Sequence, residues 1–252
     1  MNKLNIVIPM AGAGSRFAKA GYTDPKPLIK VHDTPMIEVV IRNLRPHIPH
    51  QFIFIVQAAH AQAYGLRNLL PAISGGGHLI EIDGLTEGAA CTVLKAQSLI
   101  NDDQPLMIAN SDQYIDCDIN AYLKSMESSS LDGIIMTMSA DDPKWSFVDL
   151  DSSRMVTRVV EKEVISNEAT VGIYNFRRGA DFVKAANDMI RRDERVNGEF
   201  YVAPTYNSLI RDGQKIGIHN IGSEADGMYG LGIPADLEFF LNLSLSHQFK
   251  IR

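Results

Sequence analysis

The sequence predicts an α/β protein in which helices cover both faces of a mainly parallel, mixed sheet, giving three layers. Apolar segments of strand length alternate with segments of helical periodicity along the whole chain. Several strand segments are apolar at nearly every position, which is typical of strands buried on both faces. The 252 residues are 45% hydrophobic and can bury a sizeable core. We expect one domain, residues 1–252, with two halves that divide near residue 130.

Each expected element follows from a local pattern. Pro35 opens a helix because its missing N–H costs little at the first helical position. Three consecutive glycines, 75–77, indicate a turn between a helix that ends near Pro71 and the next strand. The expected strands are residues 4–8, 52–56, 78–82, 105–110, 133–138, 145–150, 155–160 and 169–176. The expected helices are residues 35–44, 58–70, a helix that opens in the loop 85–94 and runs to about 100, residues 119–126, and one that ends near 211.

Composition excludes several classes of protein. The formal net charge of -6 argues against a general nucleic-acid binder, which would be basic. No apolar run reaches the length of a membrane span. The short apolar N-terminal run is interrupted by Asn5 and Pro9, so we do not expect it to be a targeting sequence. Cys91 and Cys117 cannot build a disulfide framework, and we expect a cytoplasmic protein.

The first strand is followed by a loop suited to a polyphosphate. Its residues are Ala11, Gly12, Ala13, Gly14 and Ser15. Small side chains let several backbone N–H groups turn toward one anion. Arg16 follows directly, Lys26-Pro27-Leu28 begins ten residues later, and residues 1–30 carry five basic side chains and one acidic one. Phe17 occupies the third glycine position of a dinucleotide fingerprint, and the Gly-Lys-Ser/Thr ending of a P-loop is absent.

A glycine loop that ends in Arg, followed by Lys-Pro-Leu, resembles the signature of the sugar-phosphate nucleotidyltransferases. The resemblance implies the nucleotide-diphospho-sugar transferase fold, which is Rossmann-like, with a nucleotide-binding half of about 1–130 and an acceptor-binding half of about 131–252. It also implies that residues 11–15 bind the nucleotide. Arg16 would hold the β and γ phosphates of a nucleoside triphosphate, and Lys26 the α-phosphate and the attacking oxygen. The plainer interpretation is a strand-to-helix turn with solvated lysines.

A second small-residue loop lies within Leu85 to Leu94. In the resembling family, a glycine followed by two small residues lets the base and ribose lie against the backbone. Gly88, Ala89 and Ala90 occupy those places, beside Glu87. A capped helix N-terminus explains the same residues.

Asp112 follows the apolar segment 105–110. Ligands of open α/β sheets collect outside the carboxyl ends of the strands, and Mg²⁺ prefers one or two carboxylates together with substrate phosphates. Asp112 also matches the metal-binding Asp of the resembling family, so we expect it to hold Mg²⁺, with Mn²⁺ as a substitute. Asp112 could instead be a turn residue.

The second half resembles the acceptor side of the family. The resemblance assigns Glu161 and Lys162 to its Glu-Lys pair, Gly172 to its later Gly-x-Tyr, and the stretch with Glu199 and Tyr201 to the surroundings of the acceptor. The plainer interpretations are a solvated Glu-Lys-Glu run for Glu161 and Lys162, and a capped helix for the stretch with Glu199 and Tyr201.

The family often has a second metal-binding Asp where this chain has Gly230. Either Asp112 suffices, or another acid, namely Asp226, Glu224 or Glu161, contributes. Together with the unusual segment 145–147, this departure indicates an acceptor other than the common hexose phosphates.

The resemblance therefore implies transfer of a nucleoside monophosphate to a sugar 1-phosphate or a phosphorylated amino compound, with release of pyrophosphate. The opening IPMAGAGSRF is closest in appearance to capsule and lipopolysaccharide members, including phosphoglutamine-type cytidylyltransferases, so CTP is the favoured donor. One rival is a glycosyltransferase of the related fold, for which Asp116-Cys117-Asp118 supplies a D-x-D pair. The other is a catalytically silent nucleotide-binding subunit. The sequence leaves the oligomeric state open, a homo-oligomer included.

Overall fold

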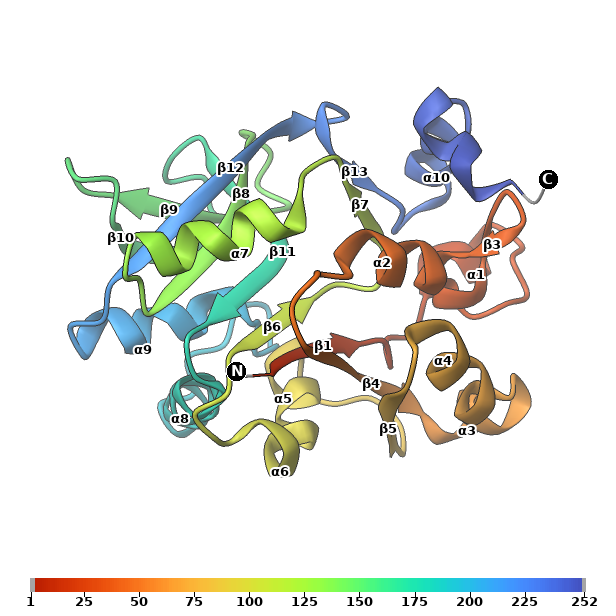
Figure 1. Ribbon diagram of the computed structural model, residues 1–252, viewed down its shortest axis with the longest axis horizontal. Helices are drawn as coiled ribbons and strands as arrows, with labels where there is room; N and C mark the ends of the chain where they lie inside the picture. Colours follow the sequence, from red (N-terminus) through yellow and green to blue (C-terminus); the bar gives the residue numbers. More distant parts are fainter. Residues whose placement is uncertain (1–2, 251–252) are drawn as a thin grey trace.

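The computed structural model describes residues 3–250 and places an eleven-stranded mixed sheet at the centre of the molecule (Figure 1). Along its main path the strand order is β5-β4-β1-β6-β11-β8-β12-β13-β7, and β9 joins β10 to the side of β11. The strands of this sheet are β1 (Leu4–Pro9), β4 (His50–Gln57), β5 (Gly77–Ile82), β6 (Leu106–Ala109), β7 (Gln113–Ile115), β8 (Gly133–Ser139), β9 (Ser146–Leu150), β10 (Val156–Glu161), β11 (Glu168–Phe176), β12 (Ile216–Glu224) and β13 (Gly227–Gly230). A small second sheet pairs β2 (Lys30–Val31) with β3 (Thr34–Pro35).

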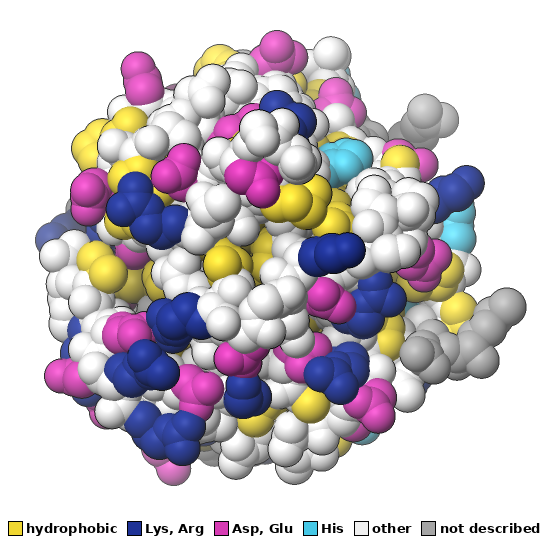
Figure 2. Space-filling model, turned by 90° about the vertical axis from the view of Figure 1, so that its left-hand side faces the viewer, with side chains coloured by type: hydrophobic (Ala, Val, Ile, Leu, Met, Phe, Trp, Pro, Cys, Tyr) yellow, Lys and Arg dark blue, Asp and Glu magenta, His cyan; other side chains and the backbone are white. Residues whose placement is uncertain are grey.

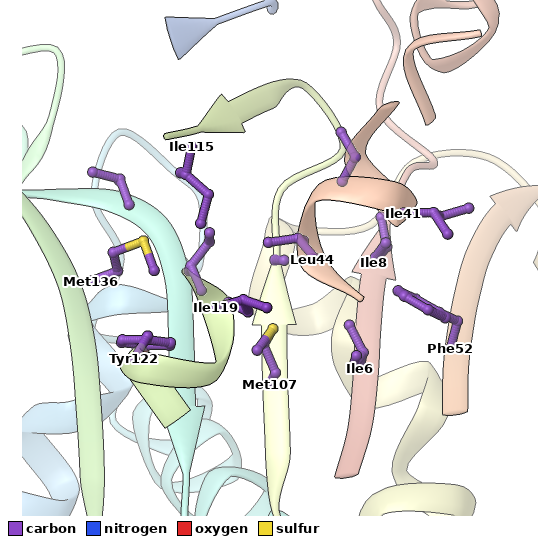
Figure 3. Packing of buried hydrophobic residues seen from close by; sticks show 14 of the residues in the cluster. Ile6, Ile8, Ile41, Leu44, Phe52, Met107, Ile115, Ile119, Tyr122 and Met136 are labelled. Atoms are coloured by element: carbon purple, nitrogen blue, oxygen red, sulfur yellow. The ribbon is translucent and has the colours of Figure 1, made fainter. Parts of the chain in front are cut away.

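Strand β1 lies inside the parallel part of the sheet, between β4 and β6. Its alternate side chains enter two different cores. Ile6 and Ile8 belong to the core on one face, whereas Val7 belongs to the core on the other. Figure 3 shows Ile6 and Ile8 beside the helix that carries Ile41 and Leu44. Burial on both faces explains why this strand is apolar at nearly every position, as the sequence predicted.

The helices divide between the two faces of the sheet. Side chains of α2 (Met36–Leu44), α4 (Leu66–Ser74) and α7 (Ile119–Ser128) fill the core on the Ile6 side. Side chains of α5 (Ala89–Val93), α6 (Gln97–Ile100), α8 (Gly179–Arg191) and α9 (Tyr206–Arg211) fill the core on the Val7 side. Figure 1 shows the same division. The predicted three-layer α/β fold is confirmed. The other helical segments are α1 (Ser15–Lys19), α3 (Ala58–Ala63) and α10 (Pro234–Leu241), with short 3-10 helices at η1 (Lys26–Leu28), η2 (Leu94–Ala96), η3 (Ala203–Thr205) and η4 (Ser244–Phe249).

Two predicted helices are wrong in detail. The segment expected as one helix over 58–70 is two, α3 and α4, because Gly65 takes a left-handed conformation with φ of 63° between them. Pro71 lies inside α4, and the helix ends at Ser74, just before the left-handed Gly75. The helix expected to run to about residue 100 is likewise divided into α5, η2 and α6. Glycine at a left-handed position ended a helix more effectively than proline did.

A third, smaller core joins the segment after β1, which includes α1 and α2, to α10. It contains Phe17 of α1, Met36 and Val39 of α2, and Leu237 and Phe240 of α10. Figure 1 shows α1, α2 and α10 in the same part of the molecule. This contact fixes the segment that carries Arg16 and Lys26 against a segment from the far end of the sequence.

The surface in Figure 2 carries basic and acidic side chains in alternation over the whole visible face, without a large patch of either sign. An electrostatic footprint for a nucleic acid would be a basic stripe, so this face does not provide one. Within residues 3–250, no helix has both the length and the apolar character needed to cross a membrane.

Candidate functional site

The loop after β1 presents free backbone donors. Met10 N–H donates to Ile55 O at 2.9 Å, and the next hydrogen bond in the chain direction is from Phe17 N–H to Gly14 O at 3.1 Å. Within the described residues 3–250, the N–H groups of residues 11–15 donate to no other protein group. Gln57 Nε2 donates to Ala11 O at 2.7 Å and holds the loop in place. Successive free N–H groups at a loop of small residues form a concave anion site.

Lys26 and Asp112, two residues that the sequence predicted at one site, are in contact. Lys26 Nζ lies 2.7 Å from Asp112 Oδ2, and their side chains are 25% and 23% exposed. Asp112 follows the end of β6, and its carbonyl oxygen accepts a hydrogen bond from Leu231 N–H at 2.8 Å. Lys26 packs against the loop, because a Cβ placed on Gly14 would lie 3.5 Å from Lys26 Cβ. Lys26 therefore connects the loop of residues 11–15, here called the anion loop, to the carboxyl end of the sheet.

A second carboxylate lies beside Gly230. A Cβ placed on Gly230 would have as its three nearest neighbours the Oδ2, Cγ and Cβ atoms of Asp236, with Oδ2 at 3.0 Å. A Cβ placed on Gly232 would lie 2.5 Å from Asp112 Oδ2. None of the three acids considered from the sequence is the one at Gly230. The acid there is Asp236 of α10, which the sequence analysis did not consider.

The donor set fits Mg²⁺ only together with substrate phosphates. Within the part of the chain that the structure describes, no group of three or more His, Cys, Asp or Glu side chains could hold a metal ion. Asp112 and Asp236 line the two neighbouring glycines 230 and 232, and both offer carboxylate oxygens. One or two carboxylates completed by phosphates and water are what Mg²⁺ uses in nucleotide sites.

Two cavities adjoin at Ala89 and Asn110. The first, here called the loop cavity, has a volume of about 310 Å³ and is lined by the anion loop and by the second small-residue loop. Its lining includes Pro9, Ala11, Gly12, Ala13, Thr86, Gly88 and Glu199. The second, here called the strand cavity, has a volume of about 280 Å³ and lies over β9, β10 and β11. Its lining includes Lys144, Trp145, Ser146, Glu161, Lys162, Gly172, Tyr174 and Tyr201.

The strand cavity combines a buried acid with a lysine on an aromatic ring. Glu161 is 8% exposed and accepts a hydrogen bond from Ser146 Oγ on its Oε2 atom. Lys162 Nζ donates to Tyr201 Oη at 2.5 Å and lies 4.7 Å from the centre of that ring. Lys162 adopts a left-handed backbone with φ of 58°, a conformation that is costly for a non-glycine residue. With Lys144 also in its lining, the cavity therefore offers two lysines and one carboxyl group to a small polar molecule.

Burial raises the pKa of the Glu161 carboxyl, and the charge of Glu199 adds to the rise, while the hydrogen bond from Ser146 and the charge of Lys162 oppose it. The folded state therefore binds a proton that the unfolded state has released at pH values above about 4.5, its ordinary pKa. Stability contributed at this position is lost as pH rises through the folded pKa.

We expect Glu161→Gln, whose side-chain oxygen still accepts the hydrogen bond from Ser146, to have a larger free energy of unfolding than the wild type at pH 8. The difference between the two free energies should vanish near pH 4. Urea unfolding at several pH values measures this, and a constant difference would contradict the assignment.

Some predicted site residues lie apart from the Lys26–Asp112 contact. Glu87 forms an ion pair with Arg195 at 2.5 Å and lines a third cavity of about 820 Å³, which shares Leu85 and Thr86 with the loop cavity. Glu199 lines the loop cavity rather than the strand cavity.

Two glycines predicted near ligands are needed by the protein itself. A Cβ on Gly88 would lie 2.5 Å from the N and O atoms of Phe200. A Cβ on Gly172 would lie 2.1 Å from Asn110 Nδ2. Gly88 and Gly172 line the two cavities, but the backbone of Phe200 explains the glycine at 88, and a left-handed φ of 81° explains the one at 172.

Sequence reasoning missed Asn110, which lines both cavities. Its position directly before Ser111-Asp112, at the end of a buried strand, was a usable signal. The D-x-D pair of the glycosyltransferase rival is explained structurally, because Asp118 Oδ1 accepts from Asn120 N–H at 2.9 Å and caps α7.

The chain belongs to the nucleotidyl transferase family, whose model matches residues 6–214. This match contains the anion loop, Lys26, Asp112 and both cavities. The nucleotidyltransferase expected from the sequence is thereby confirmed at the level of the family.

Individual relatives agree with this family. A low-salt glycan biosynthesis nucleotidyltransferase of Haloferax volcanii is 26% identical over 225 residues, which are 84% of this chain and 59% of that protein. A 2-aminoethylphosphonate cytidylyltransferase of Lancefieldella rimae is 55% identical over 42 residues, 17% of each chain. This chain thus spans about three fifths of the first relative and matches only a short part of the second.

Solved structures show the same fold. The nucleoside-diphosphate-sugar pyrophosphorylase of Vibrio cholerae superposes with a TM-score of 0.77 at 28% identity, over 94% of this chain and all of that one. A UDP-glucose pyrophosphorylase in complex with UDP-glucose superposes with a TM-score of 0.75 at 15% identity, over 96% of this chain and 98% of that one. The Rossmann-like nucleotide-diphospho-sugar fold is therefore shared.

Proposed function

We propose that this protein transfers a cytidine monophosphate group from CTP to a phosphorylated small molecule, with Mg²⁺, and releases pyrophosphate. The observation that carries the proposal is the 2.7 Å contact between Lys26 and Asp112, beside a loop whose backbone N–H groups at residues 11–15 donate to no group within residues 3–250. Cations, free N–H groups and a carboxylate at one point are the components that a triphosphate and its metal ion require.

In the proposed reaction, an oxygen of the acceptor phosphate attacks the α-phosphorus of the triphosphate in line. The new oxygen–phosphorus bond forms as the bond from the α-phosphorus to the bridging oxygen breaks, and pyrophosphate leaves with that electron pair. The attacking oxygen is already an anion, so no strong general base is needed. Catalysis then consists of positioning and charge neutralisation.

The chain's own residues supply that positioning. The N–H groups of residues 11–15 hold the triphosphate, Arg16 neutralises its β and γ phosphates, and Lys26 bridges the α-phosphate and the attacking oxygen. Asp112 would hold Mg²⁺, which when bound would neutralise charge on the phosphates. Asp112 contacts Lys26 at 2.7 Å, so the residue that would hold the metal lies beside the lysine that holds the α-phosphate.

The strand cavity is the proposed acceptor site. Lys162 would neutralise the acceptor phosphate and Glu161 would bind polar groups of the acceptor, with Gly172 and Tyr201 in the wall. Glu87, Gly88 and Ala89 would border the nucleoside. A sugar 1-phosphate or a phosphorylated amino compound fits a volume of about 280 Å³. The name of the Lancefieldella rimae relative supports CTP and an amino compound, and the glycan biosynthesis name of the Haloferax volcanii relative supports a role in cell-surface polysaccharide synthesis.

The test is pyrophosphate release with Mg²⁺. CTP, UTP, dTTP, ATP and GTP are each assayed against a panel of sugar 1-phosphates and phosphorylated amino compounds. We expect release with CTP that depends on one acceptor. Release with another triphosphate would change the donor and leave the reaction class intact. A folded protein that binds nucleotide and releases pyrophosphate with no pair would favour the silent-subunit alternative. Hydrolysis of a nucleotide sugar would favour the glycosyltransferase.

A further inference from the structure

We propose that Asp236 takes the place of the acid missing at position 230 and is, with Asp112, the second carboxylate that holds the metal of the nucleotide complex. The proposal rests on the proposed function, since it concerns the same metal-nucleotide site. It assigns a role to a residue that lies six positions away from the place where the sequence pattern puts an acid.

The backbone around Asp112 brings the two carboxylates to one edge of the sheet. Gly230 pairs with Gln113 in the β13–β7 ladder, and Leu231 N–H donates to Asp112 O at 2.8 Å. Asp112 Oδ2 occupies the space beside Gly232, and Asp236 Oδ2 occupies the space beside Gly230. The two acids therefore flank Leu231 on a single short stretch of backbone.

The glycine at position 230 leaves room for the Asp236 side chain. The three protein atoms nearest to a Cβ at Gly230 all belong to the Asp236 side chain, with Oδ2 at only 3.0 Å. An aspartate at 230 would direct its own carboxylate into the space that Asp236 already fills. The structure thus holds one carboxylate at this point and delivers it from α10 instead of from β13.

The charges around Asp236 include two groups of the proposed site, Arg16 and Asp112. Burial is the largest cause that raises the pKa of its carboxyl, and the negative charges of Glu224 and Asp112 raise it further, while the positive charges of Lys144 and Arg16 oppose the rise. Lys144 and Glu224 are themselves paired at 2.9 Å. A carboxylate that shares its surroundings with Asp112 and with the proposed phosphate-binding Arg16 is placed where a metal-triphosphate would lie.

Packing holds Asp236 in this place. Asp236 lies in the first turn of α10, and its neighbour Leu237 is 1% exposed in the third core, where α10 packs with Phe17. Since Phe17 follows Arg16 directly and Leu237 follows Asp236 directly, the same core holds the segments that carry the cation and the acid.

The first experiment measures metal binding without turnover. Mn²⁺ is titrated into the protein with CTP and no acceptor, and free Mn²⁺ is followed by its electron paramagnetic resonance signal. We expect Asp236→Asn to weaken Mn²⁺ binding by ~10-fold or more, as is usual when a group that sets a metal site is removed. Glu238→Gln, which removes one exposed charge from the same helix, is the matched control and is expected to bind within about 2-fold of the wild type.

The second experiment moves the acid back to strand β13. Asp236→Ala removes the side-chain atoms nearest to Gly230, so a carboxylate introduced by Gly230→Asp meets no competing acid in that background. We expect the double variant to recover Mn²⁺ binding to within about 3-fold of the wild type, and Asp236→Ala alone to bind as weakly as Asp236→Asn. Recovery by relocation is a result that a merely structural role for Asp236 would not give.

The outcomes separate this proposal from the proposed function. Wild-type affinity in Asp236→Asn, with weakened binding in Asp112→Asn, would overturn the role of Asp236 and leave the nucleotidyl transfer intact. A double variant that folds with the wild-type Tm but stays as weak as Asp236→Ala would also overturn it. Equal Mn²⁺ binding by the wild type and Asp112→Asn would overturn both.

Discussion

Lys26→Ala is expected to lower kcat for pyrophosphate release by ~100-fold or more, and Arg16→Ala by a similar factor. The reason is that each side chain supplies a preorganised positive charge where negative charge develops, and loss of one such contact costs about 2.7–4 kcal/mol of transition-state stabilisation. Within the described residues, only Lys26 of the two also contacts Asp112. Its Nζ atom lies 2.7 Å from Asp112 Oδ2. Its removal should therefore change the metal dependence of kcat as well.

Lys30→Ala is the control for this prediction. Lys30 is exposed in β2 and is close in sequence to Lys26. Its substitution by alanine removes one positive charge, as Lys26→Ala does. Its kcat should stay within about 2-fold of the wild type. Near-normal turnover in both Lys26→Ala and Arg16→Ala would remove the assigned mechanism.

Gly88→Ala is expected to lower the free energy of unfolding by about 3 kcal/mol, and Tm by roughly 6–12 °C. Gly88 has φ of 125° and ψ of 174°, a conformation that essentially only glycine adopts. Its new methyl group would lie 2.5 Å from two backbone atoms of Phe200, which cannot move as a flexible side chain could. Phe200 N–H donates to Glu87 O at 2.8 Å, so displacing the Phe200 backbone would also break this hydrogen bond between the two segments.

Gly84→Ala separates strain from overlap in the same loop. Gly84 also has a positive φ, 73°, but a Cβ there meets nothing within 4 Å. We expect it to cost about 1 kcal/mol, the cost of the left-handed conformation alone. Thermal unfolding monitored by circular dichroism measures both variants, and equal effects would show that the approach of Phe200 does not matter.

The features that could be predicted depend on residues that are close together in the sequence. The apolar run of β1 predicted a strand buried on both faces, and the structure confirms it with Ile6 and Val7 in opposite cores. The position of Asp112 after a buried strand predicted that it lies at the carboxyl end of the sheet. The motif through Lys26 predicted the family that the comparison with residues 6–214 confirms.

The features that were missed depend on contacts between distant segments. The glycine at 88 was attributed to a nucleotide, because nothing near it in the sequence indicates that Phe200 approaches its backbone. Asp236 was missed because a helical turn returns it to the side of Gly230, and its residue type alone is that of an ordinary acid in the first turn of a helix. The break at Gly65 was missed because Pro71 looked like the stronger stop signal.

The third core also has a consequence for the order of folding during synthesis. A ribosome makes Arg16 and Phe17 early, and α10 more than two hundred residues later. Met36 and Val39 of this core are made soon after Phe17, but Leu237 and Phe240 complete it only when α10 emerges. Domains generally fold as units once their segments are available. A nascent chain therefore carries Phe17 in a core that is only partly built until almost the whole polypeptide has been made.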